Sequence, residues 1–195
     1  MGDVVLACVA LSVNKLMTFE AGSKSGVDVE DLHLFQAATR RLQSDLGIFH
    51  SIIDPLWATD LRNELKWLGT EVGAVRDFGV LQARLVDRLR LLSAPDDSKA
   101  NRLLARLHTE RSAARLHVLD VLGCMRYRAL ANNLHDAATH PALATEAGLA
   151  IEERAARLLP YLVNKPWKKL RAAARRITSE SSEADVHAVR ILAKR

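Results

Sequence analysis

The stretch HLFQAATRRL, residues 33–42, and a second stretch HAVRILAKR, residues 187–195, decide the expected fold of this chain. In both stretches a histidine is followed, seven and eight residues later, by a pair of basic residues. Positions three or four and then seven residues apart return to the same face of a helix. The repeat therefore predicts a duplicated helical unit that carries imidazole and cationic groups along one stripe. The aligned positions are His33, Gln36 and Arg40 in the first stretch and His187, Arg190 and Lys194 in the second.

The composition agrees with helices throughout the chain. Of its 195 residues, 49% are hydrophobic, which is enough to bury a core, and only 5% are aromatic. Ala, Leu, Val and Arg are abundant, and no strand-like alternation of useful length occurs. We therefore expect an all-α fold in which helices pack antiparallel through short loops.

The charge is unevenly distributed along the sequence. Residues 1–60 carry four Lys/Arg and eight Asp/Glu, whereas residues 61–195 carry 24 and 15, and the whole chain has a net charge of +5. A basic body of this kind can serve nucleic acid, another polyphosphate or an acidic membrane face. It is also compatible with a solvated surface rich in arginine.

Helical patterns and breakers divide the chain into a first helical bundle over residues 1–140 and the start of a second over 141–195. Asp54-Pro55 is a helix start with proline at its first position, and Pro166 is read as another. The second copy of the repeat stops in mid-helix, so we expect a chain truncated within its second repeat. The expected helices cover residues 4–19, 28–53, 55–92, 98–122, 126–138, 142–159, 166–177 and 184–195.

The most basic segment runs from Lys165 to Arg176. Half of its residues are Lys or Arg, and no acid occurs between Arg157 and Glu180. Like charges at helical spacing destabilise a helix unless something neutralises them, so this face is a candidate for an anionic ligand. Three of the cations share one helix face, namely Lys168, Arg171 and Arg175. The arginine pairs 84/88, 102/106 and 111/115 are interpreted instead as surface.

Other functional classes find little support in the sequence. Cys8 and Cys124 form no CxxC and are expected to be free thiols in a reducing compartment. The apolar run from Val4 to Val13 lacks a basic n-region and is read as too short to span a membrane, so a cytoplasmic protein with no membrane partner is expected. No catalytic residues, metal ligands or cofactor motif are predicted.

These motifs together resemble the CHAD family, the conserved histidine α-helical domain. The first stretch is similar to the family pattern VHxxRVxxRRLR, with Gln36 and Gln43 where the family usually has arginine. LKWL at residues 65–68 and the following segment to Val80 resemble LKWL…LGxxRDxDV, with Gly79 in place of the second Asp. Residues 161–177 resemble the W-x-x-L-R segment that opens the second half. The second stretch is similar to HxxRIxxKRLR and keeps its arginine.

The resemblance implies two pseudo-symmetric helical bundles around a basic groove, which binds inorganic polyphosphate without catalysing a reaction. A nucleic-acid-binding helical protein and a degenerate interaction scaffold remain the alternatives. The sequence does not indicate an oligomeric state. The residues expected to bind polyphosphate are His33, Arg40, Arg41, Arg62, Lys66, Arg76, Lys168, Arg171, Arg175, His187, Arg190 and Lys194.

Overall fold

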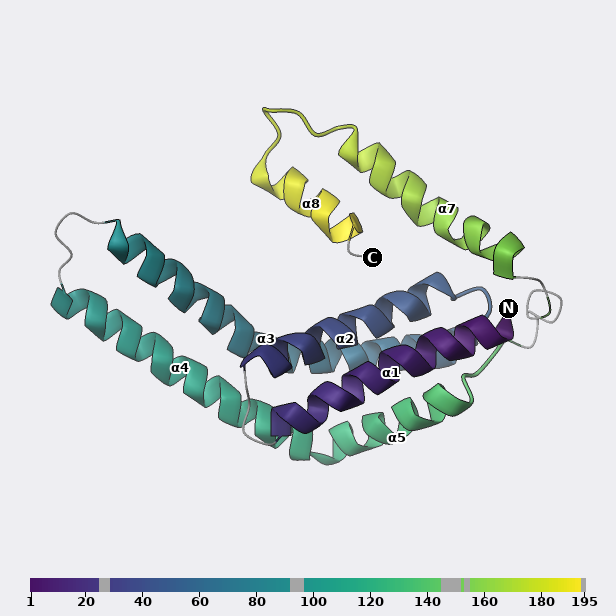
Figure 1. Ribbon diagram of the computed structural model, residues 1–195, viewed down its shortest axis with the longest axis horizontal. Helices are drawn as coiled ribbons and strands as arrows, with labels where there is room; N and C mark the ends of the chain where they lie inside the picture. The colour runs from purple at the N-terminus through teal and green to yellow at the C-terminus, as the bar shows by residue number, and fades with distance from the viewer. Residues whose placement is uncertain (25–28, 92–96, 145–151, 153–154, 194–195) are drawn as a thin grey trace.

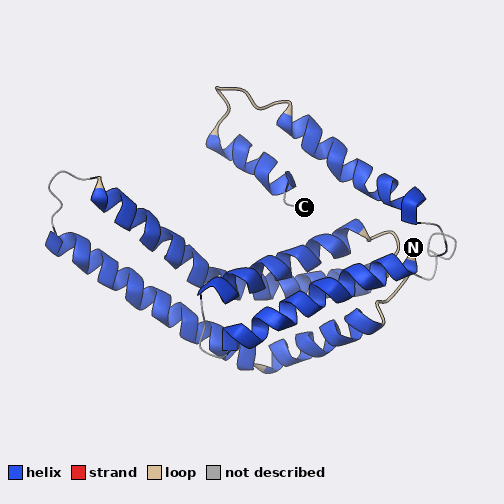
Figure 2. Cartoon of the chain, in the orientation of Figure 1, coloured by secondary structure: helices blue, strands red, loops and turns tan. Residues whose placement is uncertain are grey.

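The computed structural model describes residues 1–24, 29–91, 97–144, 152 and 155–193. Within these residues the secondary structure is helical (Figures 1 and 2). The only extended pairing among them is an isolated bridge between Ile53 and Leu143. The expectation of an all-α fold is thus confirmed. The helices are α1 (Gly2–Lys24), α2 (Val29–Ile48), α3 (Pro55–Arg90), α4 (Asp97–Gly123), α5 (Met125–Thr139), α7 (Ala155–Ala174) and α8 (Glu183–Ala193).

The core of the first repeat is built from α1, α2, α5 and the adjoining parts of α3 and α4. Helix α1 contributes apolar side chains at helical spacing, which contact α2 on one side and α5 on the other. From α2 and α3, Phe35, Leu42 and Leu65 are fully buried. The buried residues of α1 include Val5, Val9, Val13 and Leu16.

Helix α1 has 23 residues and is longer than the sequence pattern indicated. Among the described residues it is the one helix whose length and composition would allow it to cross a membrane. The expectation that this apolar run is too short for a span was therefore wrong. In the structure its apolar stripe packs into the protein core, as expected for a buried helix.

Helix α3 begins where the sequence predicts. The Asp54 side chain caps it by accepting a hydrogen bond of 2.7 Å from the backbone N–H of Trp57, and Pro55 occupies the first helical position, where an N–H would have no partner. Helix α2 ends at Ile48 rather than at residue 53. The reason is that Ile52 and Asp54 pair with the segment after α5, through Asp54 N to Ala142 O and Ala144 N to Ile52 O, both 2.9 Å.

This pairing also corrects the predicted helix over residues 142–159. Residues 142–144 are extended against the α2–α3 turn, and most of the remainder lies outside the described residues.

Beyond Val75, helix α3 leaves the bundle. Its buried residues lie between Ala58 and Val75, and the remaining turns pair with the first half of α4 as a projecting helical hairpin (Figure 1). Arg111 on α4 contacts this part of α3 by donating a hydrogen bond of 3.3 Å from Nη1 to Gln82 Oε1. Nearer the bundle, His117 Nε2 lies 2.7 Å from Glu71 Oε2. The hairpin is thus joined by polar contacts as well as by apolar packing.

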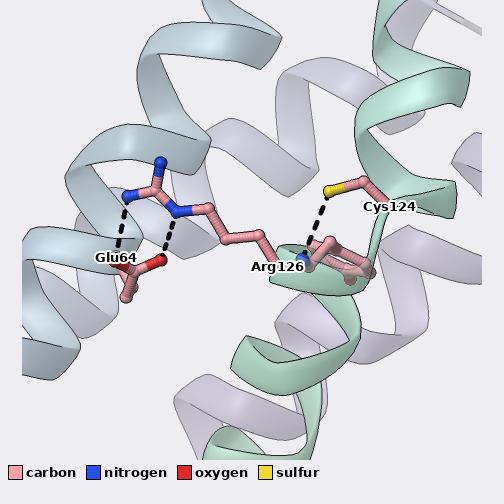
Figure 3. A network of polar contacts seen from close by, with 4 residues as sticks. Glu64, Cys124 and Arg126 are labelled. Carbon is pink, nitrogen blue, oxygen red and sulfur yellow. Dashed lines mark hydrogen bonds and ion pairs between the residues drawn. The ribbon is translucent and has the colours of Figure 1, made fainter.

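Helix α5 is attached to α3 by a network of polar contacts (Figure 3). Arg126 makes a two-pronged ion pair with Glu64, at 2.8 Å from Nε and 2.9 Å from Nη2. The guanidinium also lies 4.1 Å from the centre of the Trp67 ring, within cation–π range. The hydrogen bond from Arg126 holds the pKa of Glu64 below its ordinary value. At the start of α5, Cys124 Sγ accepts from the backbone N–H of Tyr127 at 3.4 Å.

Helices α7 and α8 form a second helical hairpin (Figure 1). The first half of α7 packs onto the core of the first repeat through Leu162, with Leu158 and Leu159 half-buried beside it. Pro166 was predicted to start a helix, but this prediction was wrong. It lies inside α7 together with Pro160. Nothing in the structure tests the proposed domain boundary near residue 140, which stays a prediction.

Candidate functional site

Close contacts between α2 and α3 fix how these two antiparallel helices lie against each other. A Cβ atom built at Gly69 would lie 3.8 Å from Thr39 Cγ2, and one at Gly73 would lie 3.1 Å from Gln36 Nε2. Near the connecting turn, a Cβ at Gly47 would lie 3.8 Å from Arg62 Nη2. The glycines therefore allow the close approach of the two helices. We call the line along which these faces meet the α2–α3 seam.

Five of the predicted ligands lie along this seam. His33 and Arg40 recur with Gly47 at a spacing of seven, on the α2 face that contacts α3. Three of the seam's cations (Arg40 on α2, Arg62 and Lys66 on α3) are exposed. No Asp or Glu occupies the positions of these two faces. The seam positions are 33, 36, 40, 43 and 47 on α2 and 62, 66, 69, 73 and 76 on α3.

Gln36 does not join the exposed stripe predicted from the sequence. It is only 4% exposed, whereas His33 and Arg40 on either side are exposed. Its Nε2 donates to the backbone oxygen of Gly69 at 3.3 Å, and its Oε1 accepts from Arg76 Nη1 at 3.4 Å, both at the long end for hydrogen bonds. Gln36 therefore holds Arg76 in place.

His33 and Arg76 line a cavity of about 370 Å³ at one end of the seam. Arg111, from α4, forms a third basic side of this cavity, although the sequence analysis assigned it to the surface. Arg111 is half-buried, and its Nε is buried without a hydrogen-bond partner. The other lining residues are apolar or glycine, namely Leu32, Val72, Val75, Gly79, Val80 and Ala83. None of the described residues that line the cavity is a carboxylate, so its electrostatic character is cationic.

Arg41 is placed differently from its neighbour Arg40. Its Nε lies 3.1 Å from Asp45 Oδ1, and Asp45 Oδ2 also accepts a 2.6 Å hydrogen bond from Ser12. Asp45 is 5% exposed, so Arg41 compensates a buried carboxylate while most of its own side chain remains in solvent. The hydrogen bond from Ser12 to Asp45 links α1 to α2. The structure thus gives Arg41 a structural partner.

The predicted ligands of the second repeat form a separate set. Lys168, Arg171 and Arg175 on α7 are exposed, as are His187 and Arg190 on α8. Their side chains make no ion pair with any acid in the described part of the chain. The cavity at the seam includes no residue of α7 or α8. The convergence of the two rows on one groove therefore stays a prediction, and Lys194 lies outside the described residues.

Comparison with known proteins confirms the resemblance drawn from the motifs. The family model of the CHAD domain matches residues 7–195. PptA from Streptomyces chartreusis superposes with a TM-score of 0.80 at 22% identity, covering 98% of this chain and 71% of that one. The CHAD domain from the plant Ricinus communis gives a TM-score of 0.75 at 24% identity, covering 100% and 62%.

At these identities the structural likeness shows the fold alone. This chain spans less than two thirds of the Ricinus communis chain. No curated protein sequence matches it.

Proposed function

The chain belongs to the CHAD family, and from that premise we propose that it binds inorganic polyphosphate along the α2–α3 seam. CHAD domains in general are associated with this linear polyanion. The observation that carries the proposal is the run of cations along the seam with no carboxylate among them. Because neighbouring positive charges repel, an anion that lies between them relieves an energetic cost as well as making new contacts.

Each kind of side chain on the seam suits phosphate oxygens. Arginine offers a planar fork of N–H donors, and lysine supplies a mobile point charge. Arg62, Lys66 and Arg40 are exposed and can follow a flexible chain, whereas Arg76 is held by Gln36. The glycines let α2 and α3 approach closely, so the cations of both helices flank one line. The exposed cations of α7 and α8 would bind a second stretch of the same ligand.

We further propose that binding involves no catalytic step and takes place in the cytoplasm. Among the described residues, the seam and its cavity carry no acidic cluster that could hold a catalytic metal ion. Both cysteines are free thiols, which suits a reducing compartment. Burial raises the pKa of the Cys8 thiol, which makes it less reactive.

One observation favours a second candidate, binding of single-stranded nucleic acid. Tyr161 and Trp167 on α7 are 76% and 56% exposed, and Trp167 is flanked along the sequence by Lys165, Lys168 and Lys169. Exposed aromatics beside cations can stack on bases. The seam has no such aromatic residue, which is why polyphosphate is the preferred ligand there.

The test is titration of long-chain polyphosphate and of single-stranded DNA of equal charge into the same protein. We expect tighter binding of polyphosphate. Arg40→Ala and Lys66→Ala should each weaken it several-fold, while Arg106→Ala, which removes an exposed arginine of α4 away from the seam, should leave it unchanged. DNA binding equal to or tighter than polyphosphate binding, or equal effects of all three variants, would overturn the proposal.

A further inference from the structure

We propose that the cavity at the end of the seam is a socket for one terminal phosphate group of a polyphosphate chain. That the ligand is polyphosphate rests on the proposed function, whereas the affinity of the cavity for a phosphate group rests on its own basic side chains. His33 from α2, Arg76 from α3 and Arg111 from α4 face the same cavity. Since three different helices supply these groups, their arrangement depends on the tertiary fold and not on the repeat of one helix.

Arg111 carries the strongest indication that the cavity accepts an anion. Its Nη1 donates to Gln82, but its Nε is buried and has no partner. A buried N–H of a charged group that lacks an acceptor destabilises the protein, so such groups are rare unless a ligand satisfies them. Arg111 lines the cavity, so rotation of its side chain toward a bound phosphate would let a phosphate oxygen accept this hydrogen bond. An apolar ligand would fill the space and leave the donor unsatisfied.

Gly79 keeps the approach to Arg111 open. A Cβ atom at this position would lie 3.9 Å from both Cζ and Nε of Arg111, at ordinary contact distance. A longer side chain could therefore cover the guanidinium, and a carboxylate there would neutralise it. Gly79 itself carries no charge, so among the described lining residues all three basic groups of the cavity are available to an external anion.

The number of basic groups favours a terminal phosphate over an internal one. An internal unit of a polyphosphate has two non-bridging oxygens and one negative charge, whereas a terminal unit has three such oxygens and a second ionisation near neutral pH. The three donors of the cavity match the terminal unit. At about 30 Å³ for each liquid water, the cavity holds the equivalent of about twelve waters, so one phosphate fits with hydration.

The apolar walls also favour an end over a continuing chain. Val72, Val75 and Val80 line the cavity together with the basic groups and offer no partner for further phosphates. Along α3, by contrast, Arg76, Lys66 and Arg62 follow one another on the seam face toward the α2–α3 turn. A chain anchored by its end in the cavity would extend along this row, so its internal phosphates would meet the exposed cations.

The test compares long polyphosphate with free ends, the same polymer with both ends capped by an uncharged amine as phosphoramidates, and tripolyphosphate. The wild-type protein should bind the free-ended polymer more tightly than the capped one. Arg111→Met keeps the apolar stem of the side chain and should weaken tripolyphosphate binding about tenfold, because one charge-assisted contact is lost. It should also abolish the difference between the free and capped polymers. Lys66→Ala should weaken both polymers alike and keep that difference.

A second pair of variants guards against misfolding. Gly79→Asp should reproduce the loss of tripolyphosphate binding, while Gly123→Asp, which adds the same carboxylate at an exposed position outside the cavity, should not. Helix content by circular dichroism checks that all variants fold. If capping has no effect on the wild-type protein, or Arg111→Met binds tripolyphosphate normally, the socket is refuted, whereas the proposal that the seam binds the polymer is not affected by this result. If tripolyphosphate binds through Arg111 and long chains do not bind, the socket stands and the proposed function fails.

Discussion

The contrast between Gly69 and Gly73, two glycines one turn apart in α3, gives a prediction that depends directly on the packing of the seam. Replacing a helical glycine by alanine ordinarily stabilises a helix by about 1 kcal/mol. At Gly69 the new methyl group would meet Thr39 Cγ2 at 3.8 Å, which is ordinary contact. Gly69→Ala should therefore raise the free energy of unfolding by up to about 1 kcal/mol, or roughly 2–4 °C in Tm for a chain of this size.

At Gly73 the same methyl group would lie 3.1 Å from Gln36 Nε2. The buried amide must shift and weaken its hydrogen bonds to Gly69 O and Arg76, each worth about 1 kcal/mol or less. This loss cancels or exceeds the helical gain, so Gly73→Ala should be neutral or destabilising by about 1 kcal/mol. Urea unfolding followed by circular dichroism measures both variants. Equal stabilisation by the two alanines would show that Gln36 is not held against Gly73 as described.

The same pair separates stability from binding. Arg76 is held by Gln36 Oε1, so Gly73→Ala should weaken the binding of polyphosphate through loss of that orientation. Gly69→Ala leaves this contact in place and should bind normally.

Three further predictions follow from other contacts. Because Arg126 holds the pKa of Glu64 below its ordinary 4.5, the ion pair stabilises the protein above that pH, and this contribution is lost as the pH falls through the lowered value. On acidification the wild-type protein should therefore lose more free energy of unfolding than Glu64→Gln. An equal loss in the two proteins, measured by urea unfolding at each pH, would contradict this. Asp45→Ala removes a buried acceptor of Ser12 and Arg41 and should lower the unfolding free energy by about 2 kcal/mol, measured by urea titration, against a negligible change for the exposed Asp60→Ala. Arg171→Glu combined with Arg175→Glu should weaken polyphosphate binding if α7 contributes to the site, whereas unchanged binding in a titration would restrict the ligand to the first repeat.

The sequence predicted those features of the fold that depend on residues close together in the chain, such as helix caps and buried helix faces. The Asp54-Pro55 start of α3 is an example, because a capping side chain and a proline at the first position act within one helical turn. The apolar spacing of Leu61, Leu65 and Leu68 likewise predicted the buried face of that helix. Where tertiary contacts compete, the prediction failed. Proline is common at the first position of a helix, which is why Pro166 was predicted to start one. Instead α7 begins at Ala155 and places Leu158 and Leu162 against the first repeat.

The candidate site shows the same division. The repeat of histidine and arginine at helical spacing predicted that His33 and Arg40 share one helix face, and both are exposed on α2. It misjudged Gln36, which shares their spacing but turns toward α3 and is buried. It also missed Arg111, whose place in the cavity depends on how α4 packs against α3. Two other lining residues of that cavity, His33 and Arg76, were among the ligands predicted from the sequence.

The most direct test of the account is the salt dependence of polyphosphate binding to the wild-type protein and to the double variant Arg40→Ala/Lys66→Ala. For a flexible polyanion, each cation that displaces a counterion contributes about 0.7 to the slope of log K against log salt concentration. The double variant should therefore lower the magnitude of this slope by about 1.4, whereas Arg106→Ala/Arg128→Ala, with the same loss of net charge at exposed positions off the seam, should leave it unchanged. Identical slopes for both double variants would mean that polyphosphate is attracted by net charge and does not lie on the α2–α3 seam.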